Sequence, residues 1–210
     1  MTGTPDVLSA VAAYYSAKVA AHGPTARGAD WNSAEAQELR FEQLLRLYDG
    51  PGPFSVNDYG CGYGALAAFL HRRGLVSRYC GFDVSAPMLA EARRFTGGLG
   101  LDDCSFVETP TGLGSADFTL ASGIFNVRLA TPIDAWERHV DDTLEHMASV
   151  SRRGFAFNML TAYADRDRMR GDLYYADPLA YFVRCRKFSR RVALLHDYPL
   201  WEFTLLVRLP

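Results

Sequence analysis

Hydrophobic and polar positions follow two different periods along this chain. From Ile133 to Met147, apolar residues recur at steps of three and four through Trp136, Val140 and Leu144, which is typical of one face of an amphipathic helix. Short runs rich in β-branched and aromatic residues, bounded by glycine or charged residues, are typical of buried strands. These patterns predict strands over residues 54–59, 78–82, 105–108, 117–121, 155–158, 190–196 and 201–208. They predict helices over residues 6–21, 33–48, 65–73, 86–95, 133–149 and 178–187.

A segment rich in proline and glycine divides the chain. Asp49-Gly50-Pro51-Gly52-Pro53 cannot continue a helix, because proline removes a backbone donor and glycine is conformationally costly to order. Two helices are predicted before this segment, and Asn32 or Ser33 can cap the start of the second. We therefore expect an N-terminal helical cap over residues 1–50 and a larger domain over residues 51–210.

Strands and helices alternate through the larger domain. Such alternation predicts a parallel sheet covered by helices on both faces. Only Asp197-Tyr198-Pro199-Leu200 separates the last two predicted strands, which is short enough for a hairpin, so the last strand should run antiparallel. The expected fold class is α/β, with a seven-stranded, mostly parallel sheet, an antiparallel C-terminal hairpin and added N-terminal helices.

Composition and charge narrow the class of protein further. Hydrophobic residues make up 49% of the 210 residues, enough for a core, which excludes a disordered or collagen-like chain. With 22 Lys+Arg against 24 Asp+Glu, nothing favours broad binding to nucleic acid or anionic lipid. The four cysteines lack the spacing of a zinc site or a disulfide framework. No signal-peptide pattern and no apolar run of about 20 residues is present. We therefore expect a cytoplasmic protein with no metal and no membrane segment.

The most informative segment is the loop Val56-Asn57-Asp58-Tyr59-Gly60-Cys61-Gly62-Tyr63-Gly64, which follows a predicted strand and opens a predicted helix. Glycines at such a place allow a tight turn and let a ligand lie against the backbone at the helix N-terminus. Asp83 ends the next predicted strand, 23 residues after Gly60. A carboxylate at about that spacing can accept hydrogen bonds from both ribose hydroxyls of an adenosine. Together the loop and the acid predict a cofactor that contains a nucleoside.

The spacing of the loop does not by itself choose the cofactor, because Gly60-x-Gly62-x-x-Ala65 also satisfies the dinucleotide fingerprint. Asp58 would add negative charge beside a pyrophosphate, and it suits a ligand with an ammonium or sulfonium group better. The stretches NDYGCGYG, GFDVSAPMLAEAR and ADFTLASGIFN resemble the class I S-adenosylmethionine-dependent methyltransferases, from about Phe54 to the C-terminus. The stretches HGPTARGADWNSAEAQELRF, LYYADP and HDYPLWEF resemble a smaller bacterial set of single-domain members.

This resemblance implies a Rossmann-like fold and S-adenosylmethionine as cofactor, with residues 51–210 as the methyltransferase domain. By position, it implies that Asp58, Gly60 and Gly62 face the methionine moiety, that Asp83 binds the ribose and that Met88 packs near the adenine. The other residues expected to line the cofactor are Cys61, Val84, Ser122 and Gly123.

Two residues before the glycine loop are also candidates for the cofactor site. Tyr15 could close over the cofactor from the first helix, or it could belong to the core of that helix. Arg40 could clamp the methionine carboxylate bidentately, or it could be an exposed, solvated side chain.

The acceptor should lie beyond the carboxyl ends of the strands, near the point where the strand order reverses. The loops after the fourth and fifth predicted strands face that point, and residues 161–177 form a long loop typical of a lid or binding segment. The candidate substrate-binding residues are Asn126, Arg128, Asn158, Thr161, Tyr163, Tyr174 and Tyr175. The candidate catalytic residues are Asn158, Tyr163 and His196. His71, His139 and His146 fall on predicted helices and are expected to lie away from the site.

The long loop mixes tyrosines with both signs of charge, which suits a small polar or aromatic metabolite better than a lipid or duplex nucleic acid. No dedicated base is evident, so methylation of an oxygen or a nitrogen atom stays open. One alternative is a small NAD(P)-linked oxidoreductase, which would need a catalytic donor such as a Tyr-x-x-x-Lys pair. Another is a non-catalytic protein that binds the cofactor on the same fold. The oligomeric state is left undetermined.

Overall fold

A single mixed sheet organises the chain in the computed structural model, which describes residues 7–101 and 103–210. Its strand order is β3-β2-β1-β4-β5-β8-β7, and a short strand, β6, pairs with β5 beside this path. The strands are β1 (Phe54–Tyr59), β2 (Val76–Phe82), β3 (Cys104–Val107), β4 (Ala116–Ala121), β5 (Ser151–Thr161), β6 (Tyr175–Ala176), β7 (Arg191–Leu195) and β8 (Glu202–Arg208). The helices are α1 (Val7–His22), α2 (Ala34–Leu45), α3 (Ala65–Arg72), α4 (Ala86–Gly98), α5 (Ile133–Ser149) and α6 (Pro178–Cys185).

The order of the strands reverses between β1 and β4. Strand β1 pairs in parallel with β2 on one side and with β4 on the other. The chain builds outward from β1 to β3, returns to β4 and continues in parallel to β5. Strand β8 then pairs antiparallel with both β5 and β7, as the predicted C-terminal hairpin requires. In an open sheet of this kind, ligands bind beyond the carboxyl ends of the strands at the reversal, here β1 and β4.

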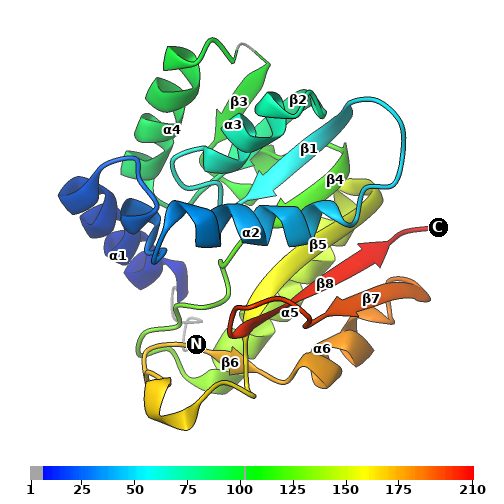
Figure 1. The fold of residues 1–210 in the computed structure, drawn as a ribbon. Coiled ribbons are helices and arrows are strands. Elements are labelled where there is room, and N and C mark those ends of the chain that lie inside the picture. The colour runs from blue at the N-terminus through cyan, green and yellow to red at the C-terminus, as the bar shows by residue number, and fades with distance from the viewer. Residues whose placement is uncertain (1–6, 102) are drawn as a thin grey trace, which may run out of the picture.

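The two faces of the sheet carry separate hydrophobic cores. One core joins β1, β4 and β8 to α2, α3 and α4 through residues such as Phe41, Leu44 and Phe69. The other joins the opposite face of the sheet to α5 and α6 through residues such as Trp136 and Tyr181. In Figure 1, α2 crosses in front of the sheet while α5 passes behind it. This three-layer arrangement confirms the α/β fold class that the alternation predicted and the Rossmann-like fold that the resemblance implied.

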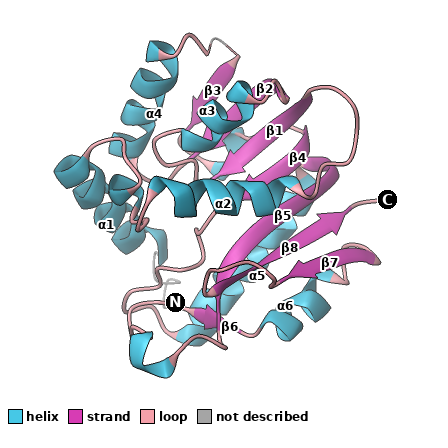
Figure 2. Ribbon diagram, viewed as in Figure 1, coloured by secondary structure: helices cyan, strands magenta, loops and turns pink. Residues whose placement is uncertain are grey.

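The N-terminal helices reach two different places on this framework. Helix α2 begins at the N-cap Ser33, whose hydroxyl accepts a hydrogen bond from Ala36 N, and it packs against β5 and β8. Helix α1 contacts α4 and α5 and lies near the carboxyl ends of the strands, which the arrowheads mark in Figure 2. Residue 6, where the sequence predicted α1 to begin, lies outside the described residues. In the part of the chain that the structure describes, no helix combines the length and the apolar character needed to span a membrane.

Strand β5 is much longer than predicted. It has 11 residues, whereas the sequence predicted a strand only over residues 155–158. The two charged residues near its beginning, Arg152 and Arg153, do not look like strand residues in the sequence. In the structure, Arg152 pairs with Asp117 at 2.9 Å and the Arg153 guanidinium stacks over Phe118 at 4.8 Å. Strand β6 has only two residues, too few to show a period, so the seven predicted strands become eight.

Candidate active site

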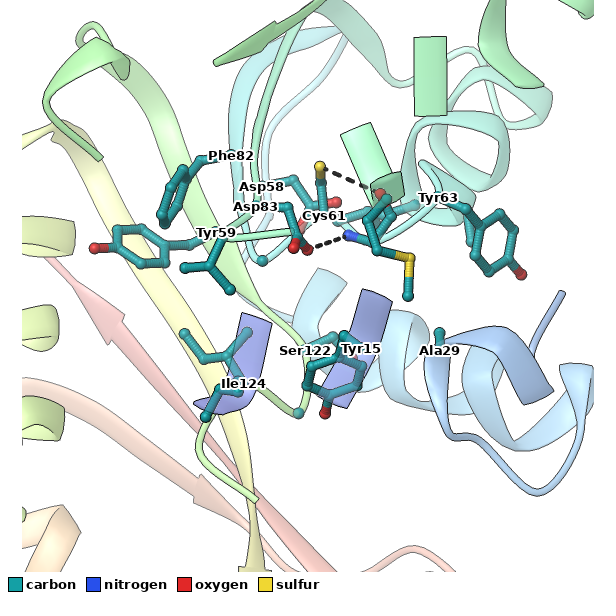
Figure 3. Close-up of a pocket in the computed structure, with 18 of the residues that line it drawn as sticks. Tyr15, Ala29, Asp58, Tyr59, Cys61, Tyr63, Phe82, Asp83, Ser122 and Ile124 are labelled. Atoms are coloured by element: carbon teal, nitrogen blue, oxygen red, sulfur yellow. Dashed lines mark hydrogen bonds between the residues drawn. The ribbon is translucent and has the colours of Figure 1, made fainter. Parts of the chain in front are cut away.

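A cavity lies where the strand order reverses, between the carboxyl ends of β1, β2 and β4 and the underside of α1 (Figure 3). It encloses about 900 Å³ of empty space, a volume that includes its open mouth. Most of the lining is apolar or aromatic, with a small set of polar groups. The lining residues are Leu8, Val11, Tyr15, Ala29, Trp31, Gln37, Phe41, Asp58, Tyr59, Gly60, Cys61, Gly62, Tyr63, Ala65, Leu66, Phe82, Asp83, Val84, Met88, Ser122, Gly123, Ile124 and His139.

The glycine loop after β1 forms the floor of this cavity. Gly60 and Gly62 have φ values of +82° and +54°, a conformation that side chains with a Cβ rarely adopt. The amides of Gly60 and Cys61 both donate to Phe82 O, at 2.7 and 2.8 Å, which ties the loop to the end of β2. A Cβ added at Gly62 would meet no protein atom within 4 Å, so the backbone there is open to a ligand.

Asp83 connects the glycine loop to the start of α4. One carboxylate oxygen accepts a hydrogen bond from Gly62 N at 2.9 Å, and the other accepts one from Ser85 N at 2.9 Å. Figure 3 shows the first of these contacts as a dashed line. Burial raises the pKa of Asp83 to about 6, although the hydrogen bonds from Ser85 and Gly62 oppose this rise. The carboxylate is therefore charged at pH 7 and faces the cavity.

Asp58, at the end of β1, is the second buried carboxylate of the site and is only 3% exposed. One of its oxygens accepts a hydrogen bond from the Tyr79 hydroxyl at 2.5 Å. Burial raises the pKa of Asp58 to about 7, the Tyr79 hydrogen bond lowers it and the nearby Asp83 charge raises it further. Two carboxylates in one apolar cavity favour a ligand that carries positive charge.

Helix α1 covers the cavity, and polar contacts hold it there. The hydroxyls of Ser16 and Ser85 lie 2.8 Å apart, which joins α1 to the start of α4. Asp30 accepts hydrogen bonds from Tyr14 and Lys18, both at 2.6 Å, and thereby fastens the loop after α1 to the helix. Tyr14 and Lys18 have the Tyr-x-x-x-Lys spacing that the oxidoreductase alternative requires. Neither residue lines the cavity, and Asp30 engages both side chains.

The structure brings together ten of the eleven residues predicted to line a cofactor. Tyr15 is among them, and it reaches the cavity from α1 (Figure 3). Arg40 is the exception. Its Nε donates to both carboxylate oxygens of Glu202, at 3.0 and 2.9 Å, and its Nη2 lies 2.5 Å from one of them. Both partners are buried, so this guanidinium already has its carboxylate and does not reach the cavity.

The residues predicted to bind the substrate lie outside the cavity. Tyr174 is 6% exposed and belongs to the core, where its hydroxyl donates to Glu137 at 2.9 Å. The Asn126 side chain accepts a hydrogen bond from Leu160 N at 3.1 Å, so it braces the loop after β4 against β5. Arg128 binds the carbonyl oxygen of Gly171 at 2.6 Å, which braces the same loop against the long loop.

Four further predicted residues also stand apart from the cavity. Thr161 is fully buried and accepts a hydrogen bond from Tyr163 N, while the Tyr175 hydroxyl accepts one from Arg170 N. Tyr163 and His196 are exposed, with ring centroids 6.2 Å apart on the outer surface. Neither ring lines the cavity.

Asn158, named as both a catalytic and a substrate-binding candidate, is fully buried. Its Oδ1 accepts a hydrogen bond from Gly123 N at 2.8 Å, and its Nδ2 donates to Glu202 at 2.6 Å. The side chain therefore contacts a wall of the cavity from behind and does not face the interior.

Several lining residues were missed from the sequence. Trp31 reaches the cavity from the loop before α2, and Gln37 and Phe41 reach it from α2 itself. The sequence contains no signal for them, because the other lining residues are far away along the chain. His139 corrects an expectation, because it lines the cavity, whereas its helix position predicted a site far away. It packs on Trp136 with ring centroids 5.3 Å apart, and burial lowers its pKa, so the imidazole is neutral at pH 7. The apolar stripe through Trp136 and Val140 could have predicted this placement, since His139 borders the stripe on the helix surface.

Comparison with known proteins identifies the class. A family model described as a methyltransferase domain matches residues 56–154. Over 166 residues the chain is 50% identical to "Putative methyltransferase Rv1506c" of Mycobacterium tuberculosis, which covers 78% of this chain and 98% of that protein. Over 90 residues it is 47% identical to a trans-aconitate 2-methyltransferase of Escherichia coli, covering 38% of this chain and 32% of that enzyme. The solved DhpI-SAM-HEP complex has the same fold, with a TM-score of 0.66 at 18% identity over 98% of this chain and 99% of that one.

The chain thus belongs to the class I S-adenosylmethionine-dependent methyltransferases, as the resemblance implied. It is a methyltransferase, and its cofactor is S-adenosylmethionine.

Proposed function

We propose that this methyltransferase binds S-adenosylmethionine in the cavity beneath α1 and transfers its methyl group to an oxygen or nitrogen atom of a small polar or aromatic metabolite. The observation that carries the proposal is the joining of the glycine loop and Asp83 at the reversal of strand order. The Gly62 amide and the Asp83 carboxylate form one continuous surface there, on which a nucleoside and its chain can both rest.

The residues present fit the cofactor. Asp83 has charged oxygens at the edge of the cavity, which suit ribose hydroxyls, and Val84 and Met88 offer apolar surface for the adenine ring. Asp58 suits the positively charged groups of the methionine moiety. The Ser122 hydroxyl is buried in the cavity wall without a hydrogen-bond partner among the described residues, which indicates a polar group that a ligand satisfies.

The bound cofactor supplies an electrophilic methyl group on a sulfonium, and the protein supplies alignment. In-line transfer gains most from holding the two reactants in register, which turns an encounter of two molecules into a unimolecular step. Helix α1 covers the cavity, and its Tyr15 lines it. His139 is the neutral imidazole of this lining, and it could accept a proton where an acceptor hydroxyl must lose one.

The acceptor that this lining supports is small. The walls near the end of β4 consist of Tyr15, Trp31, Ser122 and Ile124, which suit a compact aromatic or polar molecule. We propose that the surface around Tyr163 and His196 contacts acceptors only if they extend out of the cavity, because both side chains lie outside it.

Transfer of a labelled methyl group tests this proposal. The purified protein is incubated with methyl-tritiated S-adenosylmethionine and a bacterial extract that is divided into small-molecule, protein and nucleic-acid fractions. We expect label in a small-molecule fraction that depends on Asp83, with Asp83→Asn as the inactive comparison and the exposed Asp165→Asn as the matched control. Label that enters only the protein or nucleic-acid fraction would contradict the acceptor class.

A further inference from the structure

A closed ring of five residues forms and supports one wall of the cofactor cavity. Glu202, at the start of β8, is 1% exposed and accepts hydrogen bonds from both Arg40 and Asn158. Asn158 accepts the hydrogen bond from Gly123 N, and the Arg40 guanidinium lies over the Trp31 ring at 4.1 Å. Trp31 and Gly123 touch each other and complete the ring.

The contact between Trp31 and Gly123 is tight. A Cβ built on Gly123 would lie 2.1 Å from the Trp31 ring, so the indole occupies the space that any side chain at this position would need. Gly123 also has a φ of +74°, which independently favours glycine. Trp31 and Gly123 are the two members of the ring that line the cavity, whereas Arg40, Asn158 and Glu202 do not.

The buried ion pair between Arg40 and Glu202 is not needed for the stability of the fold. Burying an arginine and a glutamate costs desolvation energy on both sides, and apolar residues of the same size often stabilise a fold as well or better. Arg40 donates hydrogen bonds to both carboxylate oxygens of Glu202, and the flat face of its guanidinium packs on Trp31. The Arg40 side chain therefore fixes the position of the indole. Asn158 links Glu202 to the Gly123 backbone in the same way, because it donates a hydrogen bond to Glu202 and accepts one from Gly123 N.

We infer that Glu202 is a positioning residue for cofactor binding: through Arg40 and Asn158 it holds the Trp31 indole and the Gly123 backbone in register as one wall of the cavity. This inference rests on the proposed function, because it assigns the ring a role in binding S-adenosylmethionine. Glu202 itself does not touch the cavity.

Fluorine spectroscopy and calorimetry together test the inference. The chain has 3 tryptophans, so protein labelled with 5-fluorotryptophan gives a small set of ¹⁹F resonances, and Trp31→Phe assigns the one of interest. We expect Glu202→Gln to shift or broaden the Trp31 resonance while the core Trp136 resonance stays in place. In calorimetric titration, the same variant should bind S-adenosylhomocysteine about tenfold or more weakly than the wild type.

Arg46→Gln is the matched control. Arg46 and Asp197 form an ion pair between the end of α2 and the β7–β8 connection, close in sequence to the buried pair, but both side chains are exposed. This control should leave the Trp31 resonance and the affinity unchanged. If Glu202→Gln does not fold because it leaves Arg40 buried without a counter-charge, the double variant Arg40→Gln/Glu202→Gln removes both charges, keeps the side-chain length at position 202 and shortens the side chain at position 40.

The possible results distinguish failure of the positioning role of Glu202 from failure of the proposed function. Folded ring variants that only melt earlier, with the Trp31 resonance in place or the affinity within twofold of the wild type, overturn the positioning role. A wild-type protein that does not bind S-adenosylhomocysteine overturns the proposed function and with it the role in binding. The ¹⁹F spectra of the ligand-free proteins then show separately whether Glu202 holds Trp31.

Discussion

Replacing Asp58 by asparagine should stabilise the ligand-free protein above neutral pH and weaken its cofactor binding. The folded protein raises the pKa of Asp58 from 3.8 to about 7, chiefly through burial. At about 1.4 kcal/mol for each factor of ten in the proton equilibrium, holding this carboxylate charged costs the fold about 4 kcal/mol at pH 8. Asparagine has nearly the same shape and can still accept the Tyr79 hydrogen bond without that cost.

The sign of the pH dependence follows from the raised pKa. Folding takes up a proton at Asp58 between pH 3.8 and about 7, so this residue's contribution is fully favourable below that window and is lost as the pH rises through it. The advantage of Asp58→Asn should therefore be up to about 4 kcal/mol at pH 8 and shrink to less than about 2 kcal/mol at pH 5. Asp165→Asn, at an exposed position, should change the unfolding free energy by no more than about 0.5 kcal/mol.

Urea unfolding of cofactor-free protein from pH 5 to pH 8 measures these differences, and calorimetric titration measures binding. The variant should bind S-adenosylmethionine about ten- to a hundredfold more weakly, because it lacks the negative charge opposite the ligand's cationic groups. S-Adenosylhomocysteine lacks the sulfonium charge and should lose less. An Asp58→Asn protein that is less stable than the wild type at pH 8, or a stability difference that does not change with pH, would contradict the raised pKa of Asp58.

Two matched comparisons test other parts of the site. Gly60→Ala should destabilise the fold more than Gly62→Ala. Both positions have a positive φ that strains alanine, but a Cβ at Gly60 would also lie 2.2 Å from Ile124, whereas one at Gly62 would meet nothing within 4 Å. Thermal unfolding measures both, and equal losses would contradict the loop geometry. Tyr174→Ala should cost about 3–5 kcal/mol of unfolding free energy because the ring is buried, whereas Tyr163→Ala should stay within about 0.5 kcal/mol. A stable Tyr174→Ala protein would restore this tyrosine as a candidate for binding.

The parts of the fold that the sequence predicts well are those whose signal is local. The helix over residues 133–149 matches α5, because its apolar stripe is complete. The strand over residues 54–59 matches β1 because its limits are local, since Gly52-Pro53 precede it and Gly60 follows it. Strand β5 was predicted too short, because its two arginines are stabilised by an ion pair and an aromatic ring that lie far away in sequence.

The same distinction governs the site. Gly60 of the glycine loop and Asp83 lie 23 residues apart, and local spacing was enough to pair them. Arg40 could not be placed in this way, because its partner Glu202 is 162 residues away and only the folded sheet brings them together. Tyr174 misled for the opposite reason. It stands in a polar loop and looks like a binding residue, but it anchors that loop in the core through Glu137.

Titration of the wild type and of Asp83→Asn with S-adenosylmethionine, S-adenosylhomocysteine and NADH tests most directly whether this cavity holds the methyl donor. We predict micromolar binding of S-adenosylhomocysteine, an affinity at least about tenfold lower in Asp83→Asn because a charged hydrogen-bond acceptor is lost, and no binding of NADH. Tight binding of NADH without any response to S-adenosylhomocysteine would contradict it, and so would an Asp83→Asn protein with unchanged affinity.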